Sequence, residues 1–305
     1  QDWVVAAGGS SSDSISGMQI ANDGCIGLKA SRAIRRGDKL LSVPQSLAIT
    51  AEAALRSDLG TWLADFDPVL ADYSLIALAY LHERRLGEQS EFAAWLSSPV
   101  LPSAIDVPLT WAVESQQELC ASSSAPMRER FHAVDADYAW LEENAFSAAP
   151  VFFPPSVFNK QAFTEAVALA ISRCVWLPSA DGGQPALVPL FDLPNHETEP
   201  NAAVRTKAAR AGFFGTQGEP AAVLLEAEVD IAQGQPICIR YADATCAELL
   251  LDYGFLQEPV PAEASMTFWI DLEDINHDDK CDVAEGVGLA AEQAFVLTEQ
   301  GELSE

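Results

Sequence analysis

Two kinds of hydrophobic pattern follow one another along the chain. Between residues 18 and 50, short apolar runs are separated by the turn signals "NDG" and "RRGD", which predicts short β-strands. Between residues 51 and 176, apolar residues recur at the spacing of a helix face. From residue 186 the strand pattern returns, and residues 247–256 predict a short helix or a tight connector.

The predicted elements can be placed by residue number. Helices are expected over residues 72–85, 90–102, 110–120, 125–146 and 159–177. Strands are expected over residues 186–193, 201–206, 221–229 and 235–242. The N-terminal residues 1–17 contain "GGSSSDSISG", which predicts a flexible loop.

Two strand-rich parts are therefore separated by a helical insertion of more than a hundred residues. The two parts have to pair around the insertion to form one core. This order predicts an α+β fold of small sheets and lacks the βαβ alternation of doubly wound cofactor folds. The expected divisions are a flexible N-terminus at 1–17, a first β-rich part at 18–50, the helical insertion at 51–176, a second β-rich part at 177–260, and a further segment at 261–305.

Composition and charge narrow the classes of partner. The 305 residues are 49% hydrophobic, which is typical of a globular protein. The formal net charge of −28 argues against nucleic acid as a partner and allows a basic protein surface, although solubility alone also explains it. No apolar run reaches the ~18 residues of a membrane span, so we expect no membrane as a partner. We also expect a monomer.

Cysteine usage and short motifs support no metal site and no dinucleotide site. The six cysteines show no CxxC spacing, and we expect reduced, mostly buried thiols and an intracellular location, with chloroplast, cytoplasm and nucleus equally compatible. "GVGLAA" at residues 286–291 matches GxGxxA without a preceding strand. "DINHDDKCDVAE" at residues 274–285 has EF-hand oxygen ligands, but Asp279 stands where that loop requires glycine.

The stretch "LVPLFDLPNHETEPNAAV", residues 187–204, combines an apolar run with a polar turn. His196 taken alone is most simply a turn histidine that makes local hydrogen bonds. A hydrolase triad lacks a nucleophile in this motif, and one histidine beside Asp192 lacks the three ligands of catalytic zinc.

Three ordered motifs change this interpretation. They are "DGCIGLKASRAIRRGDKLLSVP" at 23–44, "NHETEPN" at 195–201 and "GQPICIRYADATCAELLLDYGF" at 234–255. Together they resemble the signature of SET-domain protein methyltransferases over roughly residues 18–256. The helical insertion, "ISR" at its end and "DYGF" resemble the Rubisco large-subunit methyltransferase group. The resemblance implies a SET fold split by the insertion, with residues 261–305 as the truncated start of a substrate-binding domain.

The resemblance also implies a chemistry and a set of residues. The activity would be methyl transfer from S-adenosylmethionine to a protein side-chain nitrogen, most simply a lysine of a non-histone protein. Tyr241 would be the catalytic tyrosine, and Asp192 and Tyr253 would contact the substrate. The cofactor would be held by Gly24, Cys25, Ile26, Arg173, Asn195 and His196.

Alternatives stay open for these residues and for the activity. Either tyrosine is also compatible with a core aromatic, and Arg173 with a surface helix residue. Relatives commonly carry Phe where this chain has Val175, and some carry an aromatic residue where it has Ala202 and Ala203; both places are on the substrate side of the motif set. A non-catalytic SET-like module that binds basic protein segments, or a protein-histidine methyltransferase, is therefore compatible with the same sequence.

Overall fold

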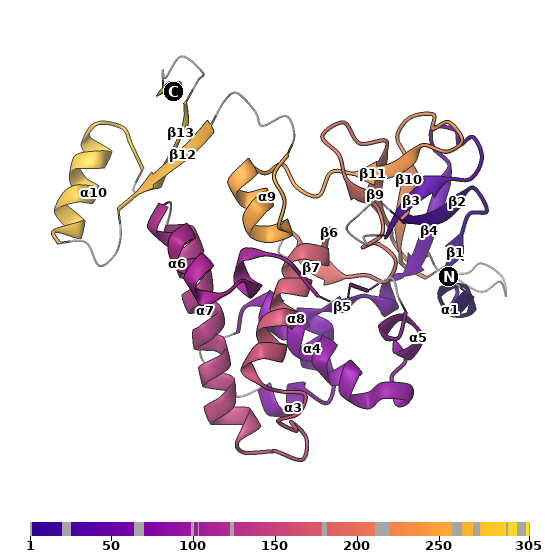
Figure 1. Cartoon of the computed structure of the whole chain (residues 1–305), viewed down its shortest axis with the longest axis horizontal. Coiled ribbons are helices and arrows are strands. Elements are labelled where there is room, and N and C mark those ends of the chain that lie inside the picture. Colours follow the sequence, from indigo (N-terminus) through magenta and orange to yellow (C-terminus); the bar gives the residue numbers. More distant parts are fainter. Residues whose placement is uncertain are drawn as a thin grey trace. The chain divides into compact units, whose positions relative to one another are not determined.

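The computed structural model describes most of the chain. The described residues are 2–19, 26–63, 70–98, 101–102, 104–122, 125–178, 182–210, 220–257, 264–270, 275–290, 292–297 and 303–304. The chain divides into two compact units, Gln1–Asp243 and Ala244–Glu305. Figure 1 labels helices and strands of both units.

Three small sheets form the β part of the first unit. One has the order β1 (Ser10–Ser11), β4 (Lys39–Pro44), β10 (Ala222–Ala227), β9 (Ala202–Lys207). The second has the order β2 (Ile15–Gln19), β3 (Ile26–Ala30), β11 (Pro236–Ile239), β8 (Asn195–His196). The third has the order β5 (Ile49–Thr50), β7 (Gln184–Leu187), β6 (Val175–Leu177).

Strands from before and after the insertion pair with each other. In the first sheet β4 and β10 are antiparallel, with Leu41 opposite Leu225, and both side chains are buried. In the second sheet β3 and β11 are antiparallel, with Leu28 opposite Ile237, and these are buried as well. The predicted pairing around the insertion, and with it the α+β class, is confirmed.

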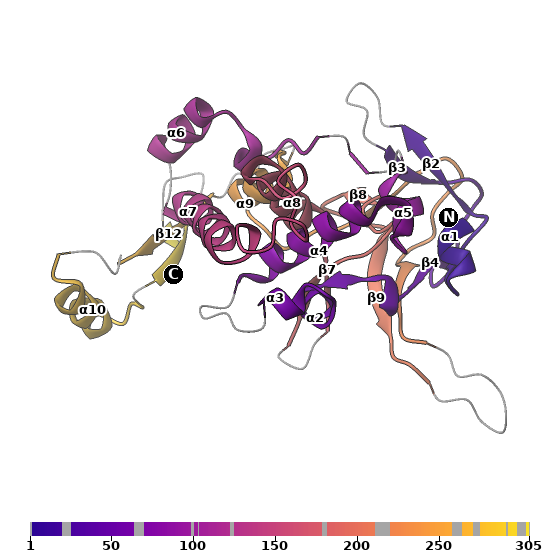
Figure 2. The same cartoon turned by 90° about the horizontal axis from the view of Figure 1, so that it is seen from below.

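The insertion supplies all α-helices described in the first unit except α1 (Asp2–Ala6), which lies at its N-terminus. They are α2 (Ala51–Arg56), α3 (Gly60–Leu63), α4 (Asp72–Leu86), α5 (Ala93–Leu96), α6 (Val113–Ser122), α7 (Ala125–Leu141) and α8 (Lys160–Arg173), with short 3₁₀ turns η1 (Gln45–Leu47), η2 (Gly87–Gln89) and η3 (Pro108–Thr110) and the π turn η4 (Glu142–Phe146). Helices α3, α4, α7 and α8 lie together at one end of this unit, away from strands β1–β4 and β9–β11 (Figure 2).

Helix α4 is the centre of the helical part. Every residue from Ser74 to His82 is buried, because α2, α8 and the third sheet surround it. Helix α8 packs along α4 and begins at Asn159, whose side chain accepts a hydrogen bond of 3.0 Å from the backbone N–H of Ala162. Five aromatic rings fill the space beside them: Tyr138, Phe146, Phe153, Phe158 and Phe163.

Four predictions about elements are wrong. The strand expected over 186–193 ends at Leu187, because the residues that follow form turns. Residues 2–17 are no loop, because α1 (Asp2–Ala6) packs Val4 into the core and strands β1 and β2 follow. The helix expected over 90–102 is only the single turn α5. The helix expected over 159–177 ends at Arg173, because Cys174 is extended and the next three residues pair with β7 as β6.

The second unit begins with α9 (Cys246–Tyr253), where the sequence predicted a short helix or connector. Thr245 and Glu248 form a capping box at its start, and Gly254, with φ of 79°, ends it. Strands β12 (Ala264–Trp269), β13 (Glu292–Leu297) and β14 (Leu303–Ser304) form an antiparallel sheet, and α10 (His277–Gly286) lies between β12 and β13 in sequence. Helix α10 occupies most of the stretch that resembled an EF-hand loop.

Candidate functional site

The site begins with a strained turn after β7. The N–H of Phe191 donates to the carbonyl of Val188 over 3.1 Å, so Pro189 and Leu190 take the central positions of a β-turn. Proline at the first of these positions and a positive φ at the second are typical of a type II turn. Leu190 has φ of 71°, a region that residues other than glycine rarely occupy, and its side chain is buried. The free energy gained by burying the Leu190 side chain offsets the cost of this backbone conformation. The turn leads the chain into β8.

The NHxxxPN motif forms a short parallel strand. Asn195 lies beside Cys238 and His196 beside Ile239, although the other strand pairs described in this sheet are antiparallel. The N–H of Glu197 continues the pairing and donates to the carbonyl of Ile239 over 3.0 Å. The two segments of the sequence motif set are therefore neighbours in space.

Asn201, the last residue of the motif, holds β11 in place. Its side-chain nitrogen donates to the carbonyl of Pro236 over 2.8 Å, and its side-chain oxygen accepts from the N–H of Cys238 over 2.9 Å. A primary amide offers one donor and one acceptor side by side, which matches the backbone of a strand. The sequence prediction gave Asn201 no role, although its place as the last residue of the NHxxxPN motif could have indicated one.

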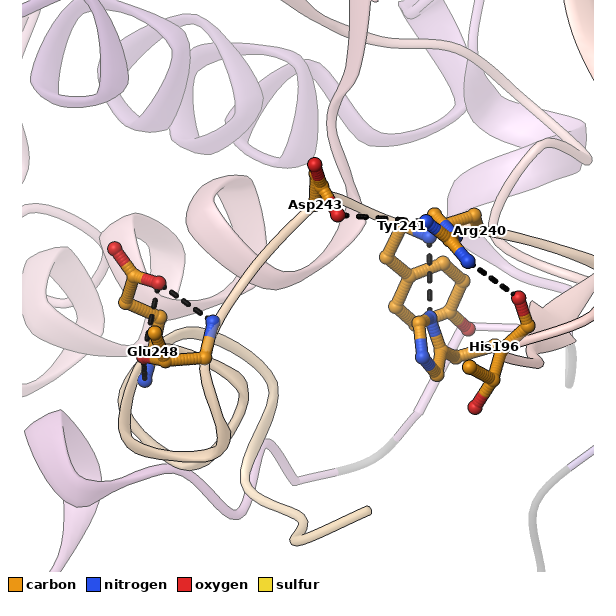
Figure 3. A network of polar contacts seen from close by, with 7 residues as sticks. His196, Arg240, Tyr241, Asp243 and Glu248 are labelled. Carbon is orange, nitrogen blue, oxygen red and sulfur yellow. Dashed lines mark hydrogen bonds and ion pairs between the residues drawn. The ribbon is translucent and has the colours of Figure 1, made fainter. Parts of the chain in front are cut away.

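His196 and Tyr241 are joined directly (Figure 3). The backbone N–H of Tyr241 donates to Nδ1 of His196 over 3.2 Å, so the neutral ring carries its proton on Nε2. The two rings are 5.4 Å apart at an angle of 59°. Burial lowers the pKa of His196; Glu197 opposes this shift and Arg240 adds to it. The lowered pKa favours the neutral ring that this hydrogen bond requires.

The hydroxyl of Tyr241 is held at the other end of the same turn. It donates to the carbonyl of Pro194 over 3.1 Å, and the ring packs against the hydrophobic core. Tyr241 is thus fixed through its backbone by His196 and through its hydroxyl by Pro194. A phenol oxygen held in this way keeps lone pairs for a second partner in a defined direction.

Arg240, which the sequence did not single out, joins the same network. Its Nη2 donates to the carbonyl of Thr198 over 2.6 Å, and its Nη1 contacts the carboxylate of Asp243 at 3.3 Å (Figure 3). The backbone on both sides of β8 is therefore tied to the end of β11. Both charged groups are exposed, so we expect this ion pair to contribute little stability.

Arg173 and Asp192 form a second, buried part of the site. Nη1 of Arg173, the last residue of α8, donates to the backbone carbonyl of Asp192 over 3.3 Å. The Asp192 side chain is 5% exposed, and burial raises its pKa to about 6 against the opposing attraction of Arg173. The backbone N–H groups of Leu190 and Asp192 also lower this pKa, but neither of them makes a well-formed hydrogen bond to an Asp192 carboxyl oxygen. Among the described residues, none bonds to the buried Nε of Arg173 either.

The remaining predicted site residues are placed as follows. Ile26 begins β3, opposite Gln19 of β2, and is half-buried against the core. Gly24 and Cys25 lie outside the described residues. Tyr253 is the last residue of α9 in the second unit, where its ring lies 6.3 Å from that of Phe255. The first unit thus brings together the histidine, the asparagines and Tyr241, and separately Arg173 with Asp192.

Other chemistries receive no support from the described part of the chain. It contains no group of three or more His, Cys, Asp or Glu side chains able to hold a metal ion. No helix within it has the length and apolar character needed to cross a membrane. The cysteines described, at 120, 174, 238, 246 and 281, are all free, but only Cys238 is buried, so the expectation of mostly buried thiols is wrong. The others lie in helices or at their ends, where side chains are partly exposed.

Comparison with known proteins identifies relatives. No protein-family model matches the chain. The chloroplastic Rubisco large-subunit N-methyltransferase of Pisum sativum is 28% identical over 279 residues, which cover 88% of this chain and 54% of that protein. A chloroplastic [fructose-bisphosphate aldolase]-lysine N-methyltransferase of Arabidopsis thaliana is 26% identical (93% and 57% covered), and an actin-histidine N-methyltransferase of Danio rerio is 27% identical (94% and 45% covered). The chain spans about half the length of these curated relatives.

Solved structures give the fold. The SET domain of LSMT, the Rubisco large-subunit methyltransferase, bound to lysine and AdoHcy matches with a TM-score of 0.77 at 24% identity, covering 99% of this chain and 67% of that one. Rubisco LSMT bound to AdoMet matches with a TM-score of 0.73 at 24% identity, covering 99% and 66%. These matches confirm the resemblance that the three motifs indicated: the chain has the SET fold of the Rubisco large-subunit methyltransferase, and its homologues are that enzyme and other SET-domain methyltransferases.

Proposed function

We propose that this protein transfers a methyl group from S-adenosylmethionine to a side-chain nitrogen of a protein substrate. The observation that carries the proposal is the position of Tyr241, which the turn of the NHxxxPN motif holds by its backbone and by its hydroxyl. The relatives support it, since they are named as methyltransferases of Rubisco, aldolase and actin.

The residues present fit this cofactor. The Nε of Arg173 is a buried donor without a hydrogen-bond partner among the described residues, as expected where a charged ligand completes the hydrogen bonding. Arg173 would hold the cofactor carboxylate, because a guanidinium fork matches two oxygens. Asn195 and His196, with Gly24, Cys25 and Ile26, would hold the remainder. When bound, the cofactor supplies an electrophilic methyl group, so the chain needs no nucleophile of its own.

Tyr241 would orient the incoming nitrogen. Because the Tyr241 O–H donates to the Pro194 carbonyl, a lone pair of the hydroxyl oxygen can accept a hydrogen bond from a substrate N–H. Holding the nitrogen in line at near-attack distance converts an encounter between two molecules into a step within one complex. Apolar surroundings favour the neutral amine over the ammonium ion, and only the neutral amine has a lone pair to attack. Tyr253 would contact the substrate side chain.

The target nitrogen is proposed to be that of a lysine in a non-histone protein. The aldolase relative is a lysine N-methyltransferase by name, and the SET domain of LSMT has been solved with bound lysine. The negative charge of this chain suits a basic substrate. Histidine is the second candidate, because the actin-histidine enzyme aligns over 94% of this chain. A deprotonated lysine amine has N–H bonds that the Tyr241 oxygen can accept, whereas the attacking nitrogen of a neutral imidazole has none, so Tyr241 would orient the two targets differently.

Two measurements test the proposal. Isothermal titration with S-adenosylmethionine should show binding, and no binding at millimolar cofactor would exclude the function. Incubation of the protein with radiolabelled cofactor and a host extract should then label a protein band, and peptide mapping by mass spectrometry would identify lysine or histidine. If cofactor binds and no band is labelled, the chain is instead a binding module with a SET fold.

A further inference from the structure

An open cavity of about 830 Å³ lies on the helical part of the first unit, between the segment before η3 and helix α6. The described residues that line it are Asp106, Trp111, Ala112, Ser115, Glu118 and Leu119. None of these belongs to the candidate site described above. Ligand sites commonly have volumes of about 300–1000 Å³, so this cavity is large enough to receive side chains of a second molecule.

Hydrogen bonds hold the walls of this cavity in place. Nε2 of Gln116, on α6, donates to the carbonyls of Pro108 and Leu109 over 3.0 Å each, which ties α6 to η3. Nε1 of Trp111 donates to Oδ1 of Asp106 over 2.7 Å. The indole ring is therefore held by its edge beside a carboxylate before any ligand arrives.

The charges in this part of the chain have one sign. Between Arg85 and Arg128 the sequence contains no Lys or Arg, and its acidic residues are Glu88, Glu91, Asp106, Glu114 and Glu118. Asp106 and Glu118 line the cavity and are exposed. Within the described part of the chain, neither of them forms an ion pair. A carboxylate accepts several hydrogen bonds, so Asp106 can hold the indole and bind a cation as well.

Two carboxylates beside an indole ring suit a cationic ligand. Tryptophan is the aromatic residue that attracts a cation most strongly, and the carboxylates supply the opposite charge. We propose that this cavity binds a lysine or arginine side chain of the protein substrate, at a position other than the nitrogen that is methylated. The inference rests on the proposed function and assigns a place where a basic substrate is held.

A basic peptide tests the cavity without any measurement of turnover. The probe is the acetylated and amidated peptide Gly-Arg-Lys-Arg-Gly, added at about 0.15 M salt, where long-range attraction is screened. The NMR signal of the Trp111 indole N–H, identified by its absence in Trp111→Leu, should shift and saturate. A signal that does not move at millimolar peptide would overturn the inference.

Paired variants separate the cavity from the overall charge of the protein. Asp106→Asn combined with Glu118→Gln should weaken peptide binding about fivefold or more, and Trp111→Leu should weaken it about two- to fivefold. The matched control is Glu88→Gln combined with Glu91→Gln, which removes the same charge from exposed positions outside the cavity. The control should bind the peptide as the wild type does. Equal weakening in the two double variants would mean that overall charge alone attracts the peptide, which contradicts the inference.

Turnover connects the cavity with the substrate. For the protein that the labelling experiment identifies, Asp106→Asn combined with Glu118→Gln should raise KM about fivefold with little change in kcat, because these groups bind the substrate and the transition state alike. An unchanged KM would overturn the inference and leave the proposed function intact. If S-adenosylmethionine does not bind, the proposed function is excluded and this inference with it, even where the peptide still moves the Trp111 signal.

Discussion

The backbone N–H of Tyr241 donates a hydrogen bond to Nδ1 of His196, 45 positions earlier in the chain. Because an imidazolium ring has no acceptor, this contact exists only while His196 is neutral. The contact therefore makes the position of Tyr241 dependent on pH. His196 acts here as the hydrogen-bond acceptor that holds the backbone of Tyr241 in place.

We expect turnover to fall at acid pH when His196 becomes protonated. Its pKa in the native protein lies below its value in the unfolded chain, so the contact is complete above the unfolded pKa of ~6.5 and is lost as pH falls through the lower native value. Turnover and the amide chemical shift of Tyr241 should both change along that acid limb. His196→Asn supplies an acceptor that does not titrate and should remove the pH dependence of the shift.

His132 provides the control for this prediction. It is exposed on α7, and His132→Asn should leave the acid limb of turnover unchanged. An amide shift of Tyr241 that titrates identically in wild type and His196→Asn would show that another group is responsible.

The hydroxyl of Tyr241 is expected to act in turnover and to contribute little to cofactor affinity. Tyr241→Phe removes the bond to Pro194 and the oriented oxygen, so turnover should fall about a hundredfold or more while S-adenosylmethionine binds nearly as before. Stability should fall by about 1 kcal/mol. Steady-state kinetics, titration calorimetry and chemical denaturation measure the three effects.

Tyr138 is the matched tyrosine for this test. Its hydroxyl donates to Glu142 over 3.1 Å in the helical part, so Tyr138→Phe should lose similar stability and keep full turnover. Comparable turnover in Tyr241→Phe and the wild type would mean that a different group orients the substrate.

Asn201 is expected to be important for stability. Asn201→Ala leaves the carbonyl of Pro236 and the N–H of Cys238 without their partner, which should cost about 1–3 kcal/mol in the free energy of unfolding. Because β11 leads into Tyr241, turnover should fall as well. Asn144→Ala removes an exposed bond to Trp140 and should stay within about 0.5 kcal/mol of the wild type in urea unfolding. Equal losses in the two variants would contradict a special role for Asn201.

Asp192 should make the ligand-free protein less stable as pH rises. Its native pKa of about 6 lies above the ordinary value, so the native state keeps this proton longer than the unfolded chain does. Its contribution to stability is therefore complete below pH ~4 and is lost as pH rises through about 6. Relative to the wild type, Asp192→Asn should gain up to about 3 kcal/mol between pH 4 and pH 8, measured by urea unfolding at each pH. A difference that does not vary with pH would exclude a raised pKa.

The sequence by itself determined the class of fold and most of the longer helices. Helices α4 and α8 follow from helical spacing of apolar residues and, for α8, from the capping residue Asn159, all of which act within a few positions. The strand halves and the motif resemblance were also readable, since alternation and turn residues are local signals. The errors fell on residues 2–17, 90–102, 174–177 and 188–193, where contacts with distant segments decide the backbone.

Only the tertiary structure decided how the candidate site is built. The parallel pairing of β8 with β11, the amide of Asn201 on β11 and the two bonds of Tyr241 join segments 35 to 47 positions apart. Such contacts depend on strand register and on the path of the strained turn at Leu190, which no local pattern encodes. Burial of Asp192 beside Arg173 arises in the same way, because the end of α8 and the turn after β7 meet only in the folded chain.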